Sequence, residues 1–204
     1  MAVLGGCIWQ AHVTKTKLWH HHEAVDVLRD IAGDSPEMLD ERYEVPARKL
    51  QKITEWMVVV GENKWTQWSP AAAKEATLWS DASDDTWAFV IEKDGVILDF
   101  KRGDCSKTDI LVSETIALSQ GLKAARKEGI TVEAMCDNQA LVYICEKGLA
   151  RNNLVNHILT DTPVEGTKVT WVPTHLQAAD PLTRGGYLEE VHHRLHLFEM
   201  GCPI

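Results

Sequence analysis

Two hydrophobic patterns divide the chain at about residue 75. Before that point, apolar residues recur every three or four positions, which is the spacing of one helix face. They are Ala24, Val27, Leu28 and Ile31 in residues 23–31, and Leu50, Ile53, Met57 and Val60 in residues 45–60. Gly33 and Gly61 follow these segments, and Pro46 precedes most of the second, as helix ends and starts require. The segment 1–75 is therefore predicted to be mainly helical.

After residue 75 the pattern changes to short runs rich in β-forming residues. Three of them, at 76–80, 87–92 and 96–102, follow one another closely. Asp94-Gly95 separates the last two, and this pair is typical of a tight hairpin turn. We expect three successive antiparallel strands.

Helices and strands alternate in the remainder of the chain. A helix is predicted from about 109 to 127 because one stripe of it is almost wholly apolar. The stripe comprises Ile110, Glu114, Ala117, Leu118, Gly121 and Ala125. A strand at 132–136, a helix from about 139 to 146, a strand at 168–172 and a helical tail from 186 complete the pattern. The predicted order is β-β-β-α-β-α-β-α.

Four acidic residues stand where such a fold can bring side chains together. Asp81 and Asp137 each end an apolar strand, Glu114 is the one acid on its helix stripe, and Asp180 lies near the end of the chain. Carboxylate oxygens are hard ligands of the kind that Mg²⁺ prefers. Together the four could hold two Mg²⁺ (or Mn²⁺) ions.

Composition narrows the class of protein. A chain of 204 residues with 45% apolar content can bury a core, as one domain with an appendage or as two small ones. It has no run of about 18 apolar residues that would span a membrane, and its start lacks the basic residues of a secretory signal. We therefore expect an intracellular protein, cytoplasmic or nuclear. The five cysteines are widely spaced and suggest neither disulfides nor a zinc site.

The formal net charge of −9 argues against a protein that binds nucleic acid through clustered lysine and arginine. It argues less against a nuclease, because bound cations would neutralise a cluster of carboxylates locally. Lys123, Arg126 and Lys127 share one face of the predicted helix 109–127. Such a group is typical of a solvated helix surface.

Four segments carry the acids in a fixed order along the chain. They are Trp79-Ser80-Asp81-Ala82-Ser83, Ser113-Glu114, Cys136-Asp137-Asn138-Gln139-Ala140, and the run from Trp171 to Gly185. In this order they resemble the ribonuclease H domains of retroelement reverse transcriptases, in particular of long-terminal-repeat or tyrosine-recombinase elements. The resemblance covers roughly residues 76–185. It implies an α/β fold, a ribonuclease H-like mixed five-stranded sheet flanked by helices, with the mainly helical segment before it.

The resemblance also implies a division of the chain into two parts. Residues 76–204 would form the ribonuclease H-like domain, and residues 1–75 look like the thumb or connection that follows the polymerase palm in such enzymes. No Tyr-x-Asp-Asp polymerase motif occurs in the sequence. A polymerase domain or subunit is therefore an expected partner.

The implied activity is hydrolysis of the RNA strand of an RNA·DNA hybrid by a two-metal mechanism. The resemblance implies a role for each acid. Asp81 would bridge both ions, and Glu114 and Asp137 would hold the ion beside the leaving group. Asp180 would hold the ion that activates water. Two divalent ions suit the reaction, since one can activate the water and the other can stabilise the leaving oxygen.

Further residues are candidates for supporting roles. His175 resembles the mobile histidine that related enzymes carry before the last acid, although its spacing of five residues to Asp180 is shorter than theirs. A loop histidine without a special task is the alternative. Ser83, Asn138 and Gln139 are predicted to hydrogen-bond the sugar or phosphate of the substrate, and a helix cap explains Asn138 equally well.

Weaker patterns favour structural readings. His20-His21-His22 is interpreted as a surface cluster, and the tryptophans, five of which precede residue 75, as core or interface residues. Two alternatives to the leading function are kept. One is a catalytically inactive ribonuclease H-like interaction or scaffold module, and the other is a nuclease of the same fold with a different nucleic-acid substrate.

Overall fold

The computed structural model describes residues 2–14, 16–32, 44–62, 73–105 and 109–201. The chain divides into two compact units. One comprises Met1–Ser69 with Gly148–Asn156, and the other comprises Pro70–Lys147 with His157–Ile204.

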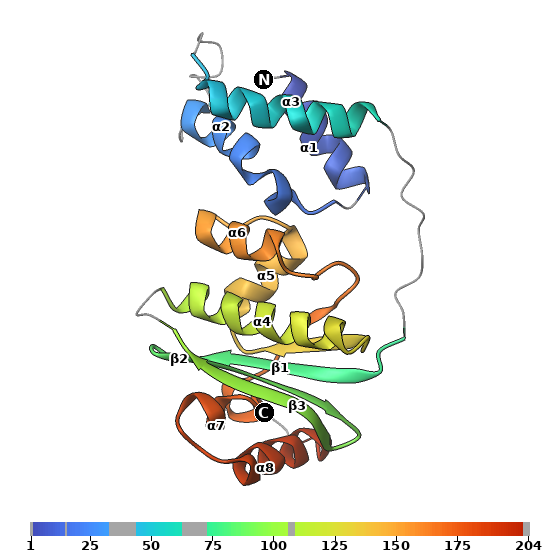
Figure 1. The fold of residues 1–204 in the computed structure, drawn as a ribbon, viewed down its shortest axis with the longest axis vertical. Helices are drawn as coiled ribbons and strands as arrows, with labels where there is room; N and C mark the ends of the chain where they lie inside the picture. Colours follow the sequence, from blue (N-terminus) through green and yellow to red (C-terminus); the bar gives the residue numbers. More distant parts are fainter. Residues whose placement is uncertain (1, 15, 33–43, 63–72, 106–108, 202–204) are drawn as a thin grey trace. The chain divides into compact units, whose positions relative to one another are not determined.

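The first unit is mainly helical, as predicted (Figure 1). Its elements are α1 (Ala2–Thr14), η1 (Leu18–His21), α2 (His22–Ala32) and α3 (Ala47–Gly61). The buried side chains at its centre are Leu4, Cys7, Ala11, Ala24, Val27, Ile53 and Trp56. The sequence did not indicate α1, because apolar residues such as Val3 and Trp9 are exposed beside the buried ones and blur the helical period.

The predicted stripe on α3 was wrong at two positions. Leu50 and Met57 are exposed, whereas Ile53 and Trp56 are buried. The helix turns this face inward because the Trp56 ring stacks on His21, with 4.5 Å between the ring centroids. On α2, Ala24 and Val27 are buried as predicted. The side chains of Leu28 and Ile31, and Gly33, lie outside the described residues.

The second unit is built on a mixed five-stranded sheet in the order β3-β2-β1-β4-β5. The strands are β1 (Ala76–Ala82), β2 (Thr86–Lys93), β3 (Val96–Asp104), β4 (Val132–Cys136) and β5 (Val169–Trp171). The β1–β2 and β2–β3 pairs are antiparallel, and the β1–β4 and β4–β5 pairs are parallel. This is a ribonuclease H-like topology, so the predicted fold class is confirmed.

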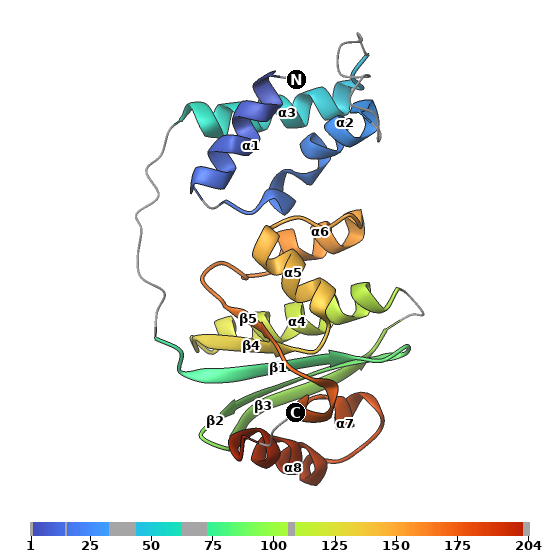
Figure 2. The same ribbon diagram turned by 180° about the vertical axis from the view of Figure 1, so that it is seen from behind.

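Helices cover both faces of this sheet, as Figures 1 and 2 show. On one face lie α4 (Ile110–Lys127) and α5 (Gln139–Lys147), and on the other lie α7 (Asp180–Thr183) and α8 (Leu188–Glu199). The predicted element order lacked α6 (Asn153–Thr160), the short α7 and the 3₁₀ turn η3 (Thr174–Leu176). Elements this short carry too few turns for a clear helical period.

The predicted hairpin between β2 and β3 is confirmed. Asp94 and Gly95 both have positive φ angles, 53° and 76°, as a tight two-residue turn requires. The turn fixes the antiparallel pairing of the two strands.

Alternation along β1 directs neighbouring side chains to opposite faces of the sheet. Leu78 meets α4, because a Cβ added at Gly121 would lie 2.5 Å from its Cδ1. Trp79 faces the other way and meets Phe198 of α8, with 4.8 Å between the ring centroids. Asp81 shares the face of Trp79, so its side chain emerges beside α7.

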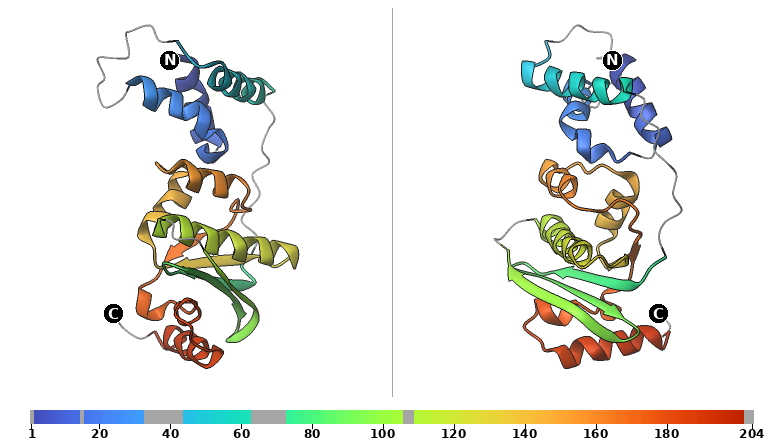
Figure 3. Two further views of the ribbon diagram at one scale, coloured as in Figure 1. Left: turned by 60° about the vertical axis from the view of Figure 1, so that its left-hand side comes forward. Right: turned by 45° about the vertical axis from the view of Figure 1, so that its right-hand side comes forward.

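Helix α4 lies flat against the sheet, as both views in Figure 3 show. The buried residues of α4 run from Val112 to Ala125 and include Glu114. Ile110 was predicted to belong to the apolar stripe but is 44% exposed, because it stands in the first turn, which Asp109 caps. Gly121 permits the close approach of helix and sheet.

We expect Gly121→Ala to lower the free energy of unfolding by about 1–3 kcal/mol, because the added methyl overpacks the contact with Leu78. Gly61→Ala is the control: a Cβ there meets nothing within 4 Å. Its effect should be neutral or slightly stabilising. Urea unfolding of both variants checks this, and equal stability of the two would contradict the close approach.

Candidate active site

The fold brings the four predicted acids to one edge of the sheet. Asp81 is the second-to-last residue of β1, Asp137 directly follows β4, Glu114 lies on α4 and Asp180 begins α7. Because β1 and β4 are parallel neighbours, their ends meet at the same edge. Asp81 interacts electrostatically with Asp137 and Asp180, and Glu114 does so with Asp81 and Asp137.

Burial makes the ionised form of Asp81 costly. Its residue is only 4% exposed. Burial, followed by the negative charges of Asp137 and Asp180, raises its pKa to about 7. A hydrogen bond from Thr183 Oγ1 to Asp81 Oδ2, 2.5 Å long, acts in the opposite direction. Thr183 therefore ties the carboxylate of β1 to α7.

Glu114 is under greater electrostatic strain than Asp81. Burial raises its pKa to about 9, and the charges of Asp81 and Asp137 add to this shift. The Ala82 backbone N–H donates a hydrogen bond to the carboxylate. The other oxygen, Oε2, is buried and has no hydrogen-bond partner among the described residues. A buried acceptor without a donor is unfavourable, and a bound cation would satisfy it.

Glu114 belongs to a group of side chains spaced closely enough to hold one metal ion. Glu114, Cys136 and Asp137 each offer an atom, and these atoms all lie within 4.8 Å of one another. Burial raises the pKa of the Cys136 thiol well above its usual value, so the thiol stays protonated. Of these groups, the carboxylates are the ones whose chemistry suits a hard ion such as Mg²⁺. Sequence reasoning did not select Cys136, although it directly precedes Asp137.

Two arginines hold Asp180. Arg184 Nε donates to Asp180 Oδ1 at 2.7 Å, and Arg194 Nη2 donates to Oδ2 at 3.3 Å. Arg194 Nη1 also donates to the carbonyl of Thr174 at 2.9 Å, which joins α8 to the turn η3. Sequence reasoning missed both arginines. Arg184 follows Asp180 by four residues, a spacing from which an ion pair could have been predicted. The position of Arg194 in the sequence gives no such indication.

The other predicted residues lie on the segments that adjoin the acids. His175 is exposed on η3, the turn that leads to Asp180. Ser83 Oγ contacts the Thr183 carbonyl at 3.3 Å, so it lies beside α7. Asn138 Oδ1 accepts a hydrogen bond from the Leu141 N–H at 3.1 Å, as the helix-cap reading predicts.

Gln139 follows directly as the exposed first residue of α5. With Asn138 it forms the start of the helix next to Asp137. The structure thus places two amide side chains beside one of the four acids. Their contacts with a substrate stay a prediction.

Gln177 is a residue of the site region to which the sequence analysis assigned no role. It is fully buried, and its Nε2 lies 3.1 Å from the Ser80 carbonyl and 3.4 Å from the Met135 carbonyl. Its Oε1 accepts from the Ala179 N–H at 3.3 Å. One side chain thus fastens the segment before Asp180 to β1 and β4.

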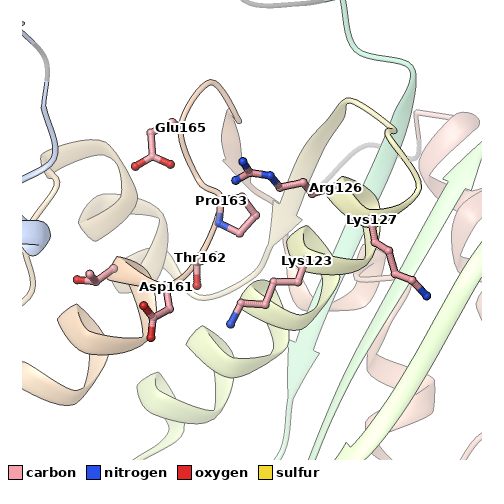
Figure 4. A pocket seen from close by; sticks show the side chains of 8 residues that line it. Lys123, Arg126, Lys127, Asp161, Thr162, Pro163 and Glu165 are labelled. Carbon is pink, nitrogen blue, oxygen red and sulfur yellow. The ribbon is translucent and has the colours of Figure 1, made fainter.

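The basic residues of α4 lie at the other end of that helix. They line a hollow of about 470 Å³ together with Thr160, Asp161, Thr162, Pro163 and Glu165. In Figure 4, Lys123 and Arg126 reach towards the segment 160–165, whereas Lys127 points away from it. Acidic side chains form part of the same wall, so the hollow is of mixed charge and lies apart from the four acids.

The histidine cluster of the first unit was predicted to lie on the surface, but it is partly buried. His21 is half-buried against Trp56, and burial lowers its pKa to about 4. His20 is exposed, as predicted. Trp19 and Trp56 are core residues, whereas Trp9 is 67% exposed and Trp65 and Trp68 lie outside the described residues.

Solved structures similar to this chain include ribonucleases H. Ribonuclease H1 from the halophilic archaeon Halobacterium salinarum is 21% identical, with a TM-score of 0.46 over 52% of this chain and 92% of that one. LC11-RNase H1 in complex with an RNA/DNA hybrid is 18% identical, with a TM-score of 0.46 over 56% and 97%. A prototype foamy virus protease-reverse transcriptase is 14% identical, with a TM-score of 0.38 over 73% and 29%.

No protein-family model matches the sequence, and no curated protein matches it. In the part of the chain that the structure describes, every helix is too short or too polar to cross a membrane.

In metal-free protein, stability should fall as the pH rises. The pKa values of Asp81 and Glu114 rise from 3.8 and 4.5 to about 7 and 9 on folding. Between these limits the native state binds more protons than the unfolded chain, so the free energy of unfolding decreases with increasing pH. Urea unfolding in EDTA from pH 5 to 9 measures this slope. Glu114→Gln should flatten it, and an unchanged slope in that variant would contradict the assignment.

Gln177→Ala should lower the free energy of unfolding by about 2–4 kcal/mol, because it leaves buried backbone groups without partners and opens a cavity. Gln139→Ala, at an exposed position, is the matched control and should change stability by less than about 0.5 kcal/mol. Thermal or urea unfolding compares the two, and similar stabilities would refute the anchoring role of Gln177.

Proposed function

We propose that the protein is a metal-dependent endonuclease that hydrolyses the RNA strand of RNA·DNA hybrids, as part of a retroelement reverse transcriptase of the long-terminal-repeat or tyrosine-recombinase type. The observation that carries the proposal is the convergence of Asp81, Glu114, Asp137 and Asp180 from separate elements, with three of them buried. Burying like charges together costs free energy that a purely structural role would avoid.

Divalent ions fit this site. Glu114 Oε2 is a buried acceptor without a donor in the described chain, and its neighbours are further carboxylates. We propose that Asp81, Glu114, Asp137 and Asp180 hold two Mg²⁺ or Mn²⁺ ions. When bound, such ions make a water nucleophilic and stabilise the charge on the leaving 3′-oxygen.

The protein's own groups orient the acids and serve the proton transfers. Thr183 fixes the carboxylate of Asp81 by a hydrogen bond. His175 stands on η3, which Arg194 joins to Asp180. Because an imidazole ring can both accept and donate a proton, we propose that His175 assists water attack or product release.

Donors for a substrate stand beside the acids. We propose that Ser83, Asn138 and Gln139 hydrogen-bond the sugar or phosphate. The Asn138 oxygen caps α5, so the amide nitrogen would be the group that donates to a substrate. Hydroxyl and amide groups suit the 2′-hydroxyls of an A-like duplex, which would be read by shape rather than by sequence.

The same proposal assigns the parts of the chain. Residues 76–204 would be the ribonuclease H-like domain, and residues 1–75 the thumb- or connection-like segment. A polymerase domain or subunit would supply part of the grip on the hybrid, because the chain itself carries a net charge of −9.

Asp81→Asn and Asp137→Asn should each lower the turnover of a hybrid by at least about 10²-fold while the fold is kept, on the scale of removing one electrostatic contributor to catalysis. Asp99→Asn, at an exposed acid of β3, is the control and should cleave normally. The assay measures cleavage of three labelled substrates, an RNA·DNA hybrid, an RNA duplex and a DNA duplex, each with Mg²⁺ or Mn²⁺. Undiminished activity in the Asp81 or Asp137 variant would overturn the proposal.

A second candidate is an inactive interaction or scaffold module of the same fold. The exposed Trp9 and the negative net charge favour it. Calorimetric titration with Mn²⁺ separates the two, because a scaffold module would show no paired binding. Preference for another duplex in the cleavage assay would instead favour the related nuclease.

A further inference from the structure

Arg184 holds Asp180 from an exposed position. Its side chain is 69% exposed, whereas that of Asp180 is only 7% exposed. Arg184 follows Asp180 by four positions, and its Nε donates a hydrogen bond of 2.7 Å to Oδ1 of the carboxylate. An exposed cation therefore covers one oxygen of a buried acid.

The charge of Arg184 also reaches the other acids. Besides Asp180, both Asp81 and Asp137 interact favourably with its guanidinium. One positive group thus serves three of the four carboxylates. In the absence of other cations, Arg184 reduces the repulsion among them.

Arg194 differs from Arg184 in its surroundings. Its side chain is 25% exposed, and it binds the Thr174 carbonyl in addition to Asp180 Oδ2. These two contacts fix it between α8 and η3. Of the two arginines that hold Asp180, Arg184 is the more exposed, so its guanidinium is the one that can turn to solvent.

The guanidinium donates to Oδ1, so it competes with a metal ion for that oxygen and places a positive charge where the ion would bind. If an ion binds there, its charge replaces that of the arginine beside the acids and repels the guanidinium. The released guanidinium then stands next to the edge where a nucleic-acid backbone must lie. Its planar fork of donors matches a phosphate, the anion that this substrate provides.

We propose that Arg184 is a substrate-binding residue that alternates between two partners, Asp180 before a divalent ion binds and a backbone phosphate of the nucleic acid afterwards. The inference rests on the proposed function, because it requires both the ions and the substrate. It makes Arg184 a competitor of the metal and a ligand of the hybrid.

Metal titration tests the first half of the inference. Calorimetry with Mn²⁺ compares the wild type with Arg184→Ala, Asp180→Asn and the double variant. The weaker of two binding events should become several-fold tighter in Arg184→Ala, because the ion then no longer competes with the guanidinium for Asp180. In the Asp180→Asn background the same substitution should have no effect. Arg126→Ala, which removes an equal charge at the far end of α4, should bind metal as the wild type does.

Hybrid cleavage tests the second half. Arg184→Ala should raise KM several-fold with little change in kcat, and the slope of log kcat/KM against log salt should become shallower by about one counterion. Arg184→Lys should restore part of the affinity, since it keeps the charge but not the fork.

The outcomes separate the inference from the function on which it rests. If the wild type binds paired ions and cleaves the hybrid, but Arg184→Ala matches Arg126→Ala in metal affinity or in KM, the alternation is wrong and the nuclease stands. If the wild type shows neither paired binding nor cleavage, both proposals fall.

Discussion

The interaction on which the structure depends is the burial of like charges at one edge of the sheet. Asp81, Glu114 and Asp180 are each about 95% buried and lie near Asp137. Desolvation and repulsion both oppose their ionised forms. The fold offsets this only in part, with the Thr183 hydroxyl, the Ala82 N–H and two guanidinium groups. Glu114 Oε2 keeps no donor within the described chain, and a bound cation would remove this residual cost.

The acids differ in how firmly the fold holds them. Asp81 lies in β1, Asp137 directly follows the neighbouring parallel strand β4, and Glu114 comes from a helix packed closely through Gly121. Asp180 stands on a short helix that side chains connect to the sheet, chiefly Gln177 and Thr183. The first three are therefore placed by strand pairing and by the packing of α4 on the sheet. The fourth is set by side-chain hydrogen bonds, and it is the member whose environment a substitution can alter without disturbing the sheet.

The same distinction explains how much the sequence could predict. The strands, the Asp94-Gly95 turn and the stripe of α4 follow from local periodicity, so three acids could be placed at a sheet edge before the structure was known. Gln177, Arg194 and the buried face of α3 depend on partners distant in the chain, for which local patterns carry no signal. The short α6 and α7 were missed because so few turns define no period. That the acids act together on a substrate stays a prediction.

Charge balance links metal and substrate in the proposed enzyme. A chain of net charge −9 repels a nucleic-acid backbone, and the four acids concentrate that repulsion where a substrate must bind. Four carboxylates and two divalent ions together carry no net charge, so the ions would remove the repulsion at the site itself. Arg184, released from Asp180, would then add a positive charge facing the duplex. Because such coupling is reciprocal, a hybrid that binds more tightly to the metal-loaded protein must tighten the metals by the same factor.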